Sequence, residues 1–499
     1  MVDPSYRATV SNSLGFFNQK PVDEVLPATW GEVKGLLEEA HVTGRPLYPL
    51  STGYNWGMGS KIPPADAVVL NLSKLNRILS YDPELGLIEV EPGVTQKDVY
   101  EFLKRNESRF FLDVTGSSED TSLMGNALER GVSYKGQRVD RVVSLEVLLP
   151  DGRLLQTGHE RFHKDGVKSP YGSGLGPDLK HLFFQSNFGV VKSMVYQLCR
   201  RKAYHYGLVL SFSDDNSLCR AMDEFNDLLH LGVIDSVFHI GNSARLREVL
   251  APSVSKRAEQ DHLVDLKKVE SLIKGSWVGS GSVTGDTFAE VRYKVKAIKK
   301  RLGRYGQVRI ARVGWEGWAA RWLNVFGLRW LSGLLLATKS LKQLYIGVPT
   351  NDTLGIVMDY PIFRKTKTPA IHVDESHRGF QYCLPILSMT SSECRRLLNF
   401  LNQVQQDQDF PLAVTLNPVR ENILEAVISI QYDKSQSEQA FRSMRKLNLE
   451  LLNREFVVYR CDIKSMDVYN DGSVHSSICR SLKKQLDPRG VIAPGRYVL

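Results

Sequence analysis

The sequence predicts an α+β protein made of two regions with different patterns. Up to about residue 200, short apolar strands alternate with small glycine-bearing loops and few helices, which does not fit a repeating βαβ unit. From residue 206 onward, long amphipathic helical segments alternate with strands. The 499 residues are 42% hydrophobic and 24% charged, as in an ordinary globular protein, and the length indicates more than one domain.

The first predicted helix and strand lead into the loop around which the chain is organised. Residues 30–43 carry apolar side chains at helical spacing, and the apolar residues 47–50 predict a short buried strand. A loop with Gly53, Gly57 and Gly59 follows. Glycine adopts positive φ and allows close approach to the backbone, so successive N–H groups in such a loop suit a pyrophosphate. A surface turn is the alternative, because the loop matches neither the G-x-G-x-x-G fingerprint nor the P-loop.

The rest of the N-terminal region predicts strands joined by turns, with one short helix. The first half of residues 67–78 is a buried strand, and the Asp-Pro-Glu turn in residues 82–86 predicts a hairpin. A helix capped by Thr95 follows, and residues 141–158 predict a strand, a turn and a second strand. Two more glycine-bearing loops occupy residues 113–131 and 171–191.

The second region predicts a further α+β unit that reaches to about residue 453. Its expected helices are residues 218–231, 256–275 and 287–302, and its expected strands are residues 236–240, 307–313 and 426–431. A strand within residues 456–463 and a helix that ends at Pro488 complete the chain.

Composition excludes several classes of protein. Six scattered cysteines without a C-x-x-C pair argue against a structural zinc site or a disulfide framework, and favour a reducing cytoplasm. His159 and His163 are four residues apart, but no third ligand completes a metal site, so no metal is expected. The N-terminus lacks the apolar segment of a secretory signal, and no stretch is long and apolar enough to span a bilayer. We expect a cytoplasmic protein without a transmembrane segment.

The net charge of +9 comes from one stretch of the chain. Residues 292–312 carry nine basic and no acidic groups. A solvated helix face followed by a strand is the simple interpretation. The alternative is a docking patch for an acidic partner, a carrier domain or an anionic membrane. No nucleic-acid-binding signature accompanies these charges, so no nucleic acid partner is expected.

Five segments together resemble the flavoproteins of the vanillyl-alcohol oxidase and 4-cresol dehydrogenase family. The match is densest in residues 46–200 and 456–497, and it is longest at the third glycine-bearing loop. The segments are STGYNWGMG (51–59), VEPGV (90–94), GNALERGVSY (125–134), YGSGLGPDLKHLFFQSNFGVV (171–191) and LDPRGVIAPGRY (486–497).

The resemblance implies a two-subdomain FAD-binding domain of the PCMH type, interrupted by an α+β cap domain with an antiparallel sheet. The expected division is 1–205 for its N-terminal part, 206–453 for the cap and 454–499 for the completing segment. The pyrophosphate of FAD requires backbone amides, and its isoalloxazine requires a polar pocket. The residues that the resemblance assigns to FAD are Ser51, Thr52, Gly53, Tyr54, Asn55, Gly57, Met58, Gly59, Ser60, Pro92, Gly93, Gly116, Ser117, Ser118, Gly125, Asn126, Arg130, Gly189, Val190, Val191 and Arg496.

The resemblance also implies a catalytic group. In that family, two tyrosines and an arginine hold a para-phenol oxygen as phenolate, and hydride passes from the benzylic carbon to flavin N5. Tyr459 and Arg460 are similar to one tyrosine and the arginine, and Arg496 is similar to the arginine that stabilises reduced flavin. A strand-end tyrosine beside a surface arginine is the alternative. Met58 replaces the second tyrosine, so a simple para-alkylphenol fits the site less well.

Family members often attach the flavin covalently through a histidine or tyrosine of the cap. Here Phe380 stands at the histidine position and Cys383 at the tyrosine position, and the glycine loop has Tyr54 in place of a histidine. We therefore expect FAD without a covalent link, with a thioether at Cys383 as the alternative. The expected substrate contacts are Met58, Cys383 and Tyr459.

The resemblance implies an FAD-dependent oxidase or dehydrogenase acting on an alcohol, amine or benzylic C–H of an aromatic or specialised-metabolite substrate. Either O2 or an electron-acceptor protein would reoxidise the flavin, and a homodimer is expected because family members often self-associate. A tailoring enzyme for a carrier-tethered substrate and a catalytically decayed flavoprotein subunit are the alternatives. Asp374, Glu375 and His377 supply a general base or form a solvated loop.

Overall fold

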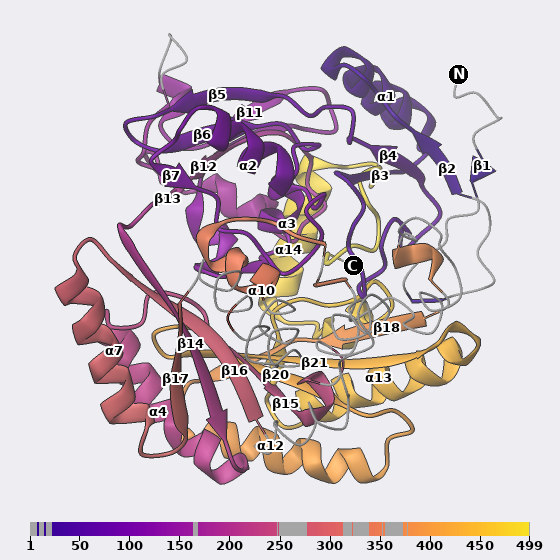
Figure 1. Cartoon of the computed structure of the whole chain (residues 1–499). Helices are drawn as coiled ribbons and strands as arrows, with labels where there is room; N and C mark the ends of the chain where they lie inside the picture. The colour runs from indigo at the N-terminus through magenta and orange to yellow at the C-terminus, as the bar shows by residue number, and fades with distance from the viewer. Residues whose placement is uncertain are drawn as a thin grey trace.

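The structure is a computed structural model, in which three main sheets and their covering helices are described (Figure 1). The predicted helix over residues 256–275 lies outside the described residues, as do His163 and His377. The described residues are 7–8, 14–15, 22–162, 168–246, 248, 277–312, 322, 339–351, 353–354, 373–376 and 378–498.

The first sheet carries the strand that leads into the glycine loop. Its region contains β1 (Arg7–Ala8), β2 (Val22–Val25), α1 (Trp30–Thr43), β3 (Leu47–Leu50) and β4 (Val68–Asn71). The strand order is β1-β2-β4-β3, and β2 and β3 run parallel to β4. Helix α1 begins after its N-cap Thr29 and ends before Gly44, which adopts the left-handed conformation. The predicted bounds of α1 and β3 are confirmed.

The second sheet is antiparallel and forms the other half of the N-terminal region. It contains β5 (Ile78–Asp82), β6 (Leu87–Val90), β10 (Val142–Leu148), β11 (Leu154–Gln156) and β12 (Val190–Gln197), in the order β11-β10-β12-β6-β5. The predicted hairpin and the predicted strand, turn and strand are confirmed as β5–β6 and β10–β11. Two short strand pairs accompany the sheet: β7 (Phe110–Phe111) with β13 (Cys199–Arg200), and β8 (Val132–Ser133) with β9 (Gly136–Gln137).

Two short helices pack beside this second sheet. Helix α2 (Gln96–Arg105) begins at the predicted cap Thr95, which forms a capping box with Asp98. Helix α3 (Leu123–Leu128) begins at Ser122, whose hydroxyl accepts a hydrogen bond from the N–H of Gly125. The side chains of both helices join one buried apolar cluster with the strands of the sheet.

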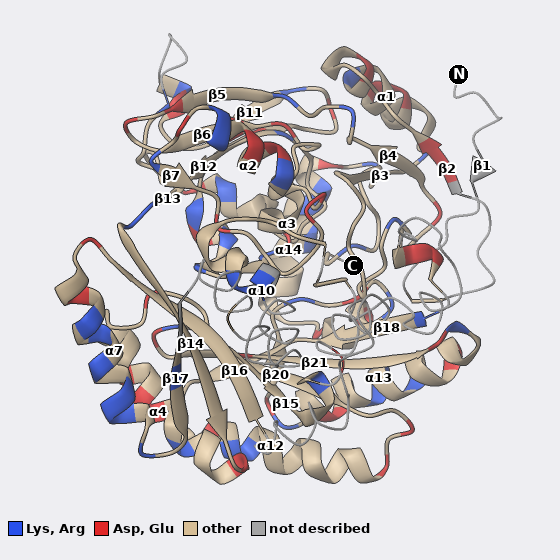
Figure 2. Ribbon diagram, viewed as in Figure 1, with Lys and Arg blue, Asp and Glu red and all other residues tan. Residues whose placement is uncertain are grey.

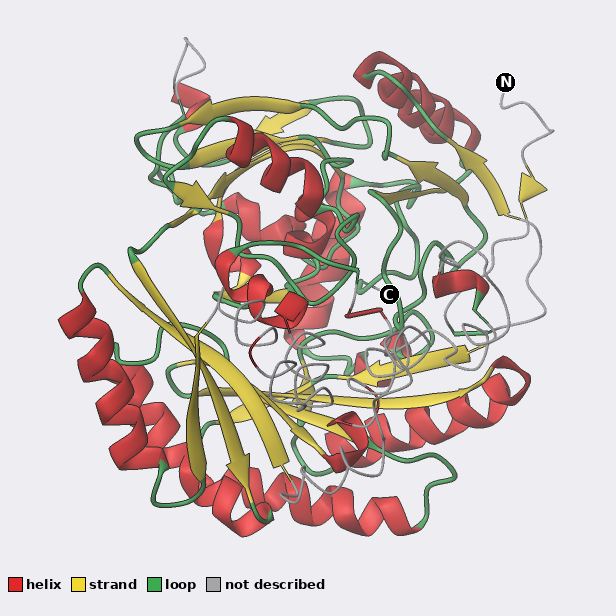
Figure 3. Cartoon of the chain, viewed as in Figure 1, coloured by secondary structure: helices red, strands yellow, loops and turns green. Residues whose placement is uncertain are grey.

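Within the described residues, the middle of the chain forms a nine-stranded antiparallel sheet whose helices lie along its outer face (Figure 3). The strands are β14 (Tyr204–Phe212), β15 (His239–Asn242), β16 (Trp277–Gly285), β17 (Gln307–Arg312), β18 (Arg378–Cys383), β19 (Pro385–Ser388), β20 (Ala413–Arg420), β21 (Ile423–Asp433) and β22 (Val457–Val458). The helices are α4 (Asp215–His230), α7 (Phe288–Leu302), α12 (Ser391–Gln406) and α13 (Ser437–Leu452), with the short α10 (Lys339–Gln343) elsewhere. Because β22 pairs with β19, the sheet extends past the predicted boundary at residue 453.

The C-terminal segment returns to the first sheet, so the two ends of the chain meet. Helix α14 (Val474–Leu486) precedes a tail in which the N–H of Ala493 donates to the carbonyl of Leu47 at 2.8 Å. The N–H of Leu47 in turn donates to the carbonyl of Val491 at 2.7 Å. Asn187, from the third glycine-bearing loop, donates to the carbonyl of Ala493 at 3.1 Å. The fold is therefore α+β, with an antiparallel-sheet unit inserted between the two parts of the N-terminal unit.

None of the described helices combines the length and the apolar character that crossing a membrane would require. The described residues also contain no group of three or more His, Cys, Asp or Glu side chains arranged to hold a metal ion.

Candidate active site

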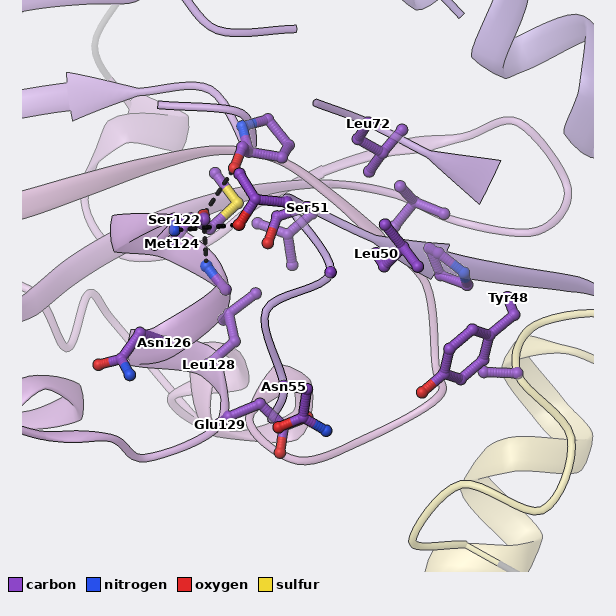
Figure 4. Close-up of a pocket in the computed structure, with 18 of the residues that line it drawn as sticks. Tyr48, Leu50, Ser51, Asn55, Leu72, Ser122, Met124, Asn126, Leu128 and Glu129 are labelled. Carbon is purple, nitrogen blue, oxygen red and sulfur yellow. Dashed lines mark hydrogen bonds between the residues drawn. The ribbon is translucent and has the colours of Figure 1, made fainter. Parts of the chain in front are cut away.

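A cavity of about 1110 Å³, part of it open to solvent, lies where β3, α3 and the C-terminal tail meet (Figure 4). Backbone and side chains of the glycine loop line one wall, and Val190 and Val191 of β12 line another. Ile492 and Ala493 of the tail close the cavity near Tyr48 of β3.

The glycine loop turns sharply because several of its residues adopt positive φ. Gly53 has φ +77°, and a Cβ there would lie 2.6 Å from the side chain of Lys61. The carbonyl of Asn55 accepts hydrogen bonds from the N–H groups of Met58 and Ser60, which closes the turn. The loop is thus held in one conformation by its own backbone, with Gly53 and Asn55 facing the cavity.

Ser122 joins three segments that the sequence places far apart. Its hydroxyl donates to the carbonyl of Pro92 at 2.6 Å, and its N–H donates to Thr52 Oγ1 at 3.3 Å. A Cβ on Gly125 would lie 2.2 Å from Ser51 Oγ, so glycine allows α3 to approach the first loop. Figure 4 shows these contacts around Ser122.

The structure brings together about two thirds of the residues that were expected to bind FAD. Those that line the cavity are Ser51, Thr52, Gly53, Tyr54, Asn55, Ser60, Pro92, Gly125, Asn126, Gly189, Val190, Val191 and Arg496. The other residues expected to bind FAD lie outside its lining: Gly57, Met58, Gly59, Gly93, Gly116, Ser117, Ser118 and Arg130. Of the residues expected to act in catalysis or to bind substrate, Arg460 and Arg496 line the cavity, while Met58, Cys383 and Tyr459 do not.

Glu129 forms the centre of a charged cluster at the cavity wall. Arg496 Nη2 lies 2.7 Å from Glu129 Oε1, and the Tyr497 hydroxyl donates to Glu129 Oε2 at 2.8 Å. Burial alone would raise the pKa of Glu129, but the positive charges of Arg496 and Arg460 and the hydrogen bonds lower it overall. Arg496 also donates to the Tyr48 hydroxyl at 3.1 Å. Two arginines and one carboxylate leave this cluster with a net charge of +1.

Arg460 offers a donor to the cavity. Its Nη2 donates to Asn55 Oδ1, while its Nε lies 3.7 Å from Glu129 Oε2, within ion-pair reach but beyond a hydrogen bond. Among the described residues, this buried Nε has no hydrogen-bond partner. Asn55 and Glu129, which both contact Arg460, are labelled in Figure 4. A buried donor without a partner is costly, which indicates that a ligand accepts from it.

Tyr459 points from the end of β22 into the inner face of the nine-stranded sheet. Its N–H donates to the carbonyl of Leu384, and its own carbonyl accepts from Gln185 Nε2 at 2.8 Å. Its side chain is hydrogen-bonded to Glu425 of β21. Burial, together with the negative charge of Glu425, raises the pKa of Tyr459 well above its ordinary value. Tyr459 is therefore a neutral phenol at the junction of the cavity and the sheet.

Asp374 fixes the glycine loop to the inserted unit. Ser60 Oγ donates to Asp374 Oδ1 at 2.6 Å, and the Trp56 indole donates to Oδ2 at 3.2 Å. Lys434 Nζ donates to the carbonyl of Asp374 at 2.6 Å. Asp374 is buried and fully engaged, so it does not form the solvated loop considered from the sequence.

The expectation that Cys383 contacts the substrate does not fit the structure. Its thiol donates to Asn448 of α13 at 3.2 Å, and it packs in the apolar core between sheet and helices. Phe380 and Tyr382 lie on the other face of β18, where a Cβ on Gly57 would approach both rings. Alternation along the strand explains the difference, because successive side chains point to opposite faces. Burial raises the pKa of the Cys383 thiol far above its ordinary value, so it is not a nucleophile.

Met58 is 1% exposed and lies outside the cavity lining, beside the segment after Tyr459. Its carbonyl accepts a hydrogen bond from the N–H of Ile463 at 3.1 Å. Gly59 packs against the side chain of Ile463, and a Cβ on Gly59 would lie only 2.8 Å from that side chain. In this structure Met58 acts as a packing residue that seats the glycine loop on the C-terminal segment.

Sequence reasoning missed several residues at the site. Glu129 belongs to GNALERGVSY, but its charge partners Arg460 and Arg496 are more than 300 positions away. Glu425 stands in an apolar strand and shows no motif of its own. The other unpredicted lining residues are Tyr48, Pro49, Leu50, Leu72, Thr121, Ser122, Met124, Leu128, Phe183, Gln185, Ser186, Ile492 and Ala493.

Comparison with known proteins agrees with this geometry. A family model described as an FAD binding domain matches residues 24–158. The chain is 27% identical to 1'-carboxy-chondrochloren decarboxylase of Chondromyces crocatus, over 99% of this chain and 94% of the relative. It is 23% identical to the 4-cresol dehydrogenase [hydroxylating] flavoprotein subunit of Pseudomonas putida, over 95% and 87%. The structure of 4-ethylphenol oxidase from Gulosibacter chungangensis superposes with a TM-score of 0.81 at 21% identity, over 99% and 93%.

The residues present fit FAD. The positive-φ glycine loop lines the cavity and is of the kind that suits a pyrophosphate, and the cluster around Glu129 beside it has a net positive charge. The loop, the short helix α3 and the tail would hold the cofactor between them. The chain is an FAD-dependent oxidoreductase, and its sequence and fold are similar to those of the 4-cresol dehydrogenase flavoprotein subunit and 4-ethylphenol oxidase.

Proposed function

We propose that this enzyme removes a hydride from the benzylic carbon of a substrate that carries a para-hydroxyphenyl group. The observation that carries the proposal is the arrangement of Tyr459 and Arg460. Arg460 lines the cavity and has an Nε without a hydrogen-bond partner among the described residues, and the preceding residue, Tyr459, is a neutral phenol next to the cavity lining. The relatives named for cresol and ethylphenol support this substrate class. FAD, when bound, supplies the hydride acceptor.

Arg460 and Tyr459 would hold the substrate's oxygen and favour its phenolate form. A phenolate donates electron density to the para carbon, so the benzylic C–H bond gives up its hydride more readily. Arg460 remains charged at any working pH, and its Nε can donate to the oxygen that carries the negative charge. A preorganised cation in a site that excludes water contributes more than the same contact in water.

The contacts of Arg496 differ from those of Arg460 and indicate a different role. It is 7% exposed, is fixed by Glu129 and Tyr48, and cannot swing toward a substrate without breaking both contacts. Burial would lower the pKa of Arg496, but the neighbouring carboxylate of Glu129 raises it overall, so its charge is permanent. We propose that this fixed charge stabilises the negative charge that develops on the cofactor, with Glu129 holding it in position.

Oxidative decarboxylation is a second candidate reaction, favoured by the relative whose printed name is a decarboxylase. Loss of hydride from the benzylic carbon leaves an electron-poor carbon conjugated to the phenol oxygen. If the neighbouring carbon bears a carboxylate, its bond to that group breaks, CO2 leaves, and the bonding electrons form a carbon–carbon double bond. The same residues would serve both reactions, because both begin with loss of the benzylic hydride.

The charges of α7 give the carrier-tethered alternative no added support. Figure 2 shows Lys and Arg along this helix, but several of them serve the fold of the inserted unit. Lys294 pairs with Asp235 and Glu290, and Arg301 pairs with Glu224 and Asp227. The remaining lysines are exposed on a solvated helix face.

Anaerobic reduction of the bound flavin tests the proposal. The FAD-loaded enzyme is mixed with para-alkylphenols and with 3-(4-hydroxyphenyl)propanoate, which carries a carboxylate on the carbon next to the benzylic one, and loss of the flavin's visible absorbance is followed. We expect bleaching by para-hydroxyphenyl compounds and none by the matched O-methyl ethers, because an ether cannot form a phenolate. Trapping of CO2 from the carboxylated substrate separates the two reactions. Equal rates with phenols and ethers would contradict the proposal, and admission of air then shows whether O2 reoxidises the flavin.

A further inference from the structure

Glu425 is a buried carboxyl that none of the roles above uses. It lies on β21 opposite Asn417 of β20, and it is 1% exposed. Asn417 Nδ2 donates to Glu425 Oε2 at 2.7 Å, and Tyr459 is hydrogen-bonded to the same carboxyl group. Among the described residues, no cation forms an ion pair with it. A buried carboxyl without an ion pair is expensive for a fold to keep, so a chemical reason for it is expected.

The hydrogen bonds behind Glu425 have a fixed direction. His239 Nδ1 lies 2.9 Å from Asn417 Oδ1, and an amide oxygen can only accept, so Nδ1 carries the proton. Burial lowers the pKa of His239 to about 4, so the ring is neutral and supplies no charge to the carboxyl. The amide N–H of Asn417 therefore points toward Glu425, and the carboxyl of Glu425 accepts this hydrogen bond. In the second hydrogen bond, the Tyr459 hydroxyl is the donor and the Glu425 carboxyl is again the acceptor.

The groups that face Glu425 come from three elements. Tyr459 approaches from the end of β22, Asn417 from β20 with His239 of β15 behind it, and Arg460 acts from beside Tyr459. Burial raises the pKa of Glu425, while the hydrogen bonds and the charge of Arg460 oppose that rise. Glu425 therefore takes up a proton more readily than an ordinary carboxyl, and its hydrogen bond with Tyr459 gives a proton a path to it.

We propose that Glu425 receives, through Tyr459, the proton that the substrate's phenol loses on binding. The inference rests on the proposed function. The substrate O–H bond breaks and its proton bonds to the Tyr459 oxygen, while the Tyr459 O–H bond breaks and that proton bonds to Glu425. The products are a phenolate, an unchanged Tyr459 and a neutral Glu425. One negative charge has then moved from Glu425 to the substrate beside Arg460.

The transfer also reverses the direction of two hydrogen bonds, the one between Tyr459 and Glu425 and the one between Tyr459 and the substrate's oxygen. Before it, Tyr459 donates to Glu425, so its oxygen can only accept from the substrate's hydroxyl. After it, Glu425 donates to the Tyr459 oxygen, and the Tyr459 hydroxyl donates to the phenolate. Tyr459 thus becomes a donor to the phenolate, a role that a second tyrosine has in the resembling family and that Met58 cannot perform here.

Proton counting with 4-nitrophenol tests the relay. This probe has no benzylic hydrogen, and its phenolate, unlike its phenol, absorbs visible light, so a difference spectrum reports its ionisation in the FAD-loaded protein. A pH-indicator dye reports protons released to weakly buffered solvent. For the wild-type protein below the probe's own pKa, we expect bound phenolate with close to no proton released, because Glu425 keeps the proton.

Glu425→Gln retains the shape of the side chain and one accepting oxygen but cannot take up the proton. We expect its bound probe either to stay a neutral phenol or to release about one proton per phenolate formed. Tyr459→Phe should behave like Glu425→Gln, and it serves if the first variant folds poorly. Glu421→Gln, at an exposed position before β21, is the matched control and should behave like wild type. FAD content and circular dichroism confirm that each variant is folded.

The contradicting outcomes separate the two claims. If wild type and Glu425→Gln bind phenolate with the same proton release, the relay is wrong while the phenol site stands. If the wild-type protein binds no 4-nitrophenol, both the proposed function and the relay are overturned.

Discussion

Replacement of Arg460 by methionine is expected to lower kcat/KM for the phenolic substrate by about 10²–10³-fold, the usual effect of losing one preorganised donor to a developing anion. Arg460 lines the cavity, and its buried Nε has no hydrogen-bond partner among the described residues. Methionine fills a similar volume but supplies neither charge nor hydrogen bond. The measurement is the rate of anaerobic flavin reduction as a function of substrate concentration.

Two further variants show what Arg460 contributes. Arg460→Lys keeps the charge but removes the planar fork that reaches Asn55 and the cavity together, so we expect an intermediate loss. Arg442→Met removes an exposed arginine of α13 and should leave the rate unchanged. If Arg460→Met reduces its flavin as fast as wild type, Arg460 does not hold the substrate, and the proposed function loses its main support.

Replacement of Glu129 by glutamine is expected to lower the free energy of unfolding by about 3 kcal/mol, at the lower end of the range for breaking a buried ion pair. The lower end applies because the Glu129 side chain is 21% exposed while that of Arg496 is 7% exposed. The variant leaves the guanidinium of Arg496 buried without its carboxylate and weakens the contact with Tyr497.

Urea unfolding of both proteins without FAD measures this cost, because unequal FAD binding would otherwise contribute to the difference. Glu39→Gln, an exposed carboxyl on α1, is the control and should change the value by less than about 0.5 kcal/mol. The pKa of Glu129 is lowered in the folded protein, so its stabilisation is present above the ordinary carboxyl pKa and is lost as pH falls through the lowered value. The difference between wild type and variant should therefore shrink in acid. A difference below about 1 kcal/mol at neutral pH would contradict the account of the cluster.

Local signals in the sequence were sufficient for elements whose ends are set by neighbouring residues. Helix α1 keeps its predicted bounds because Thr29 caps one end and Gly44 the other. Helix α2 begins at Thr95 for the same reason. The glycine loop was found because positive φ selects glycine at Gly53, wherever the loop's partners lie.

Residues whose roles depend on distant partners were the ones that could not be predicted. Glu129 and Arg496 are 367 positions apart, and no local pattern reports their ion pair. The alternation of Phe380, Gln381, Tyr382 and Cys383 indicates two faces, but only the packing of β18 against α13 decides which face is the core. The role proposed for Glu425 likewise depends on Tyr459, which lies 34 positions later, directly after β22.

The linkage of the cofactor to the chain remains a prediction. We propose that FAD is bound without a covalent link, since Phe380 has no nucleophile and Cys383 faces the core. Tyr382 is the alternative attachment point, because its phenol shares the face of β18 that approaches the glycine loop at Gly57. Tyr382→Phe would abolish a tyrosyl link and leave non-covalent binding intact.

The central claim is that both ends of the chain close over FAD while the inserted unit covers the site. Acid precipitation of the purified protein, followed by absorbance of the supernatant and mass measurement of the polypeptide, tests it most directly. The account predicts a yellow protein that releases one FAD per chain and a polypeptide of unmodified mass. FAD that stays on the polypeptide would contradict only the prediction that the cofactor is bound without a covalent link. A colourless protein that takes up no added FAD would contradict the account as a whole.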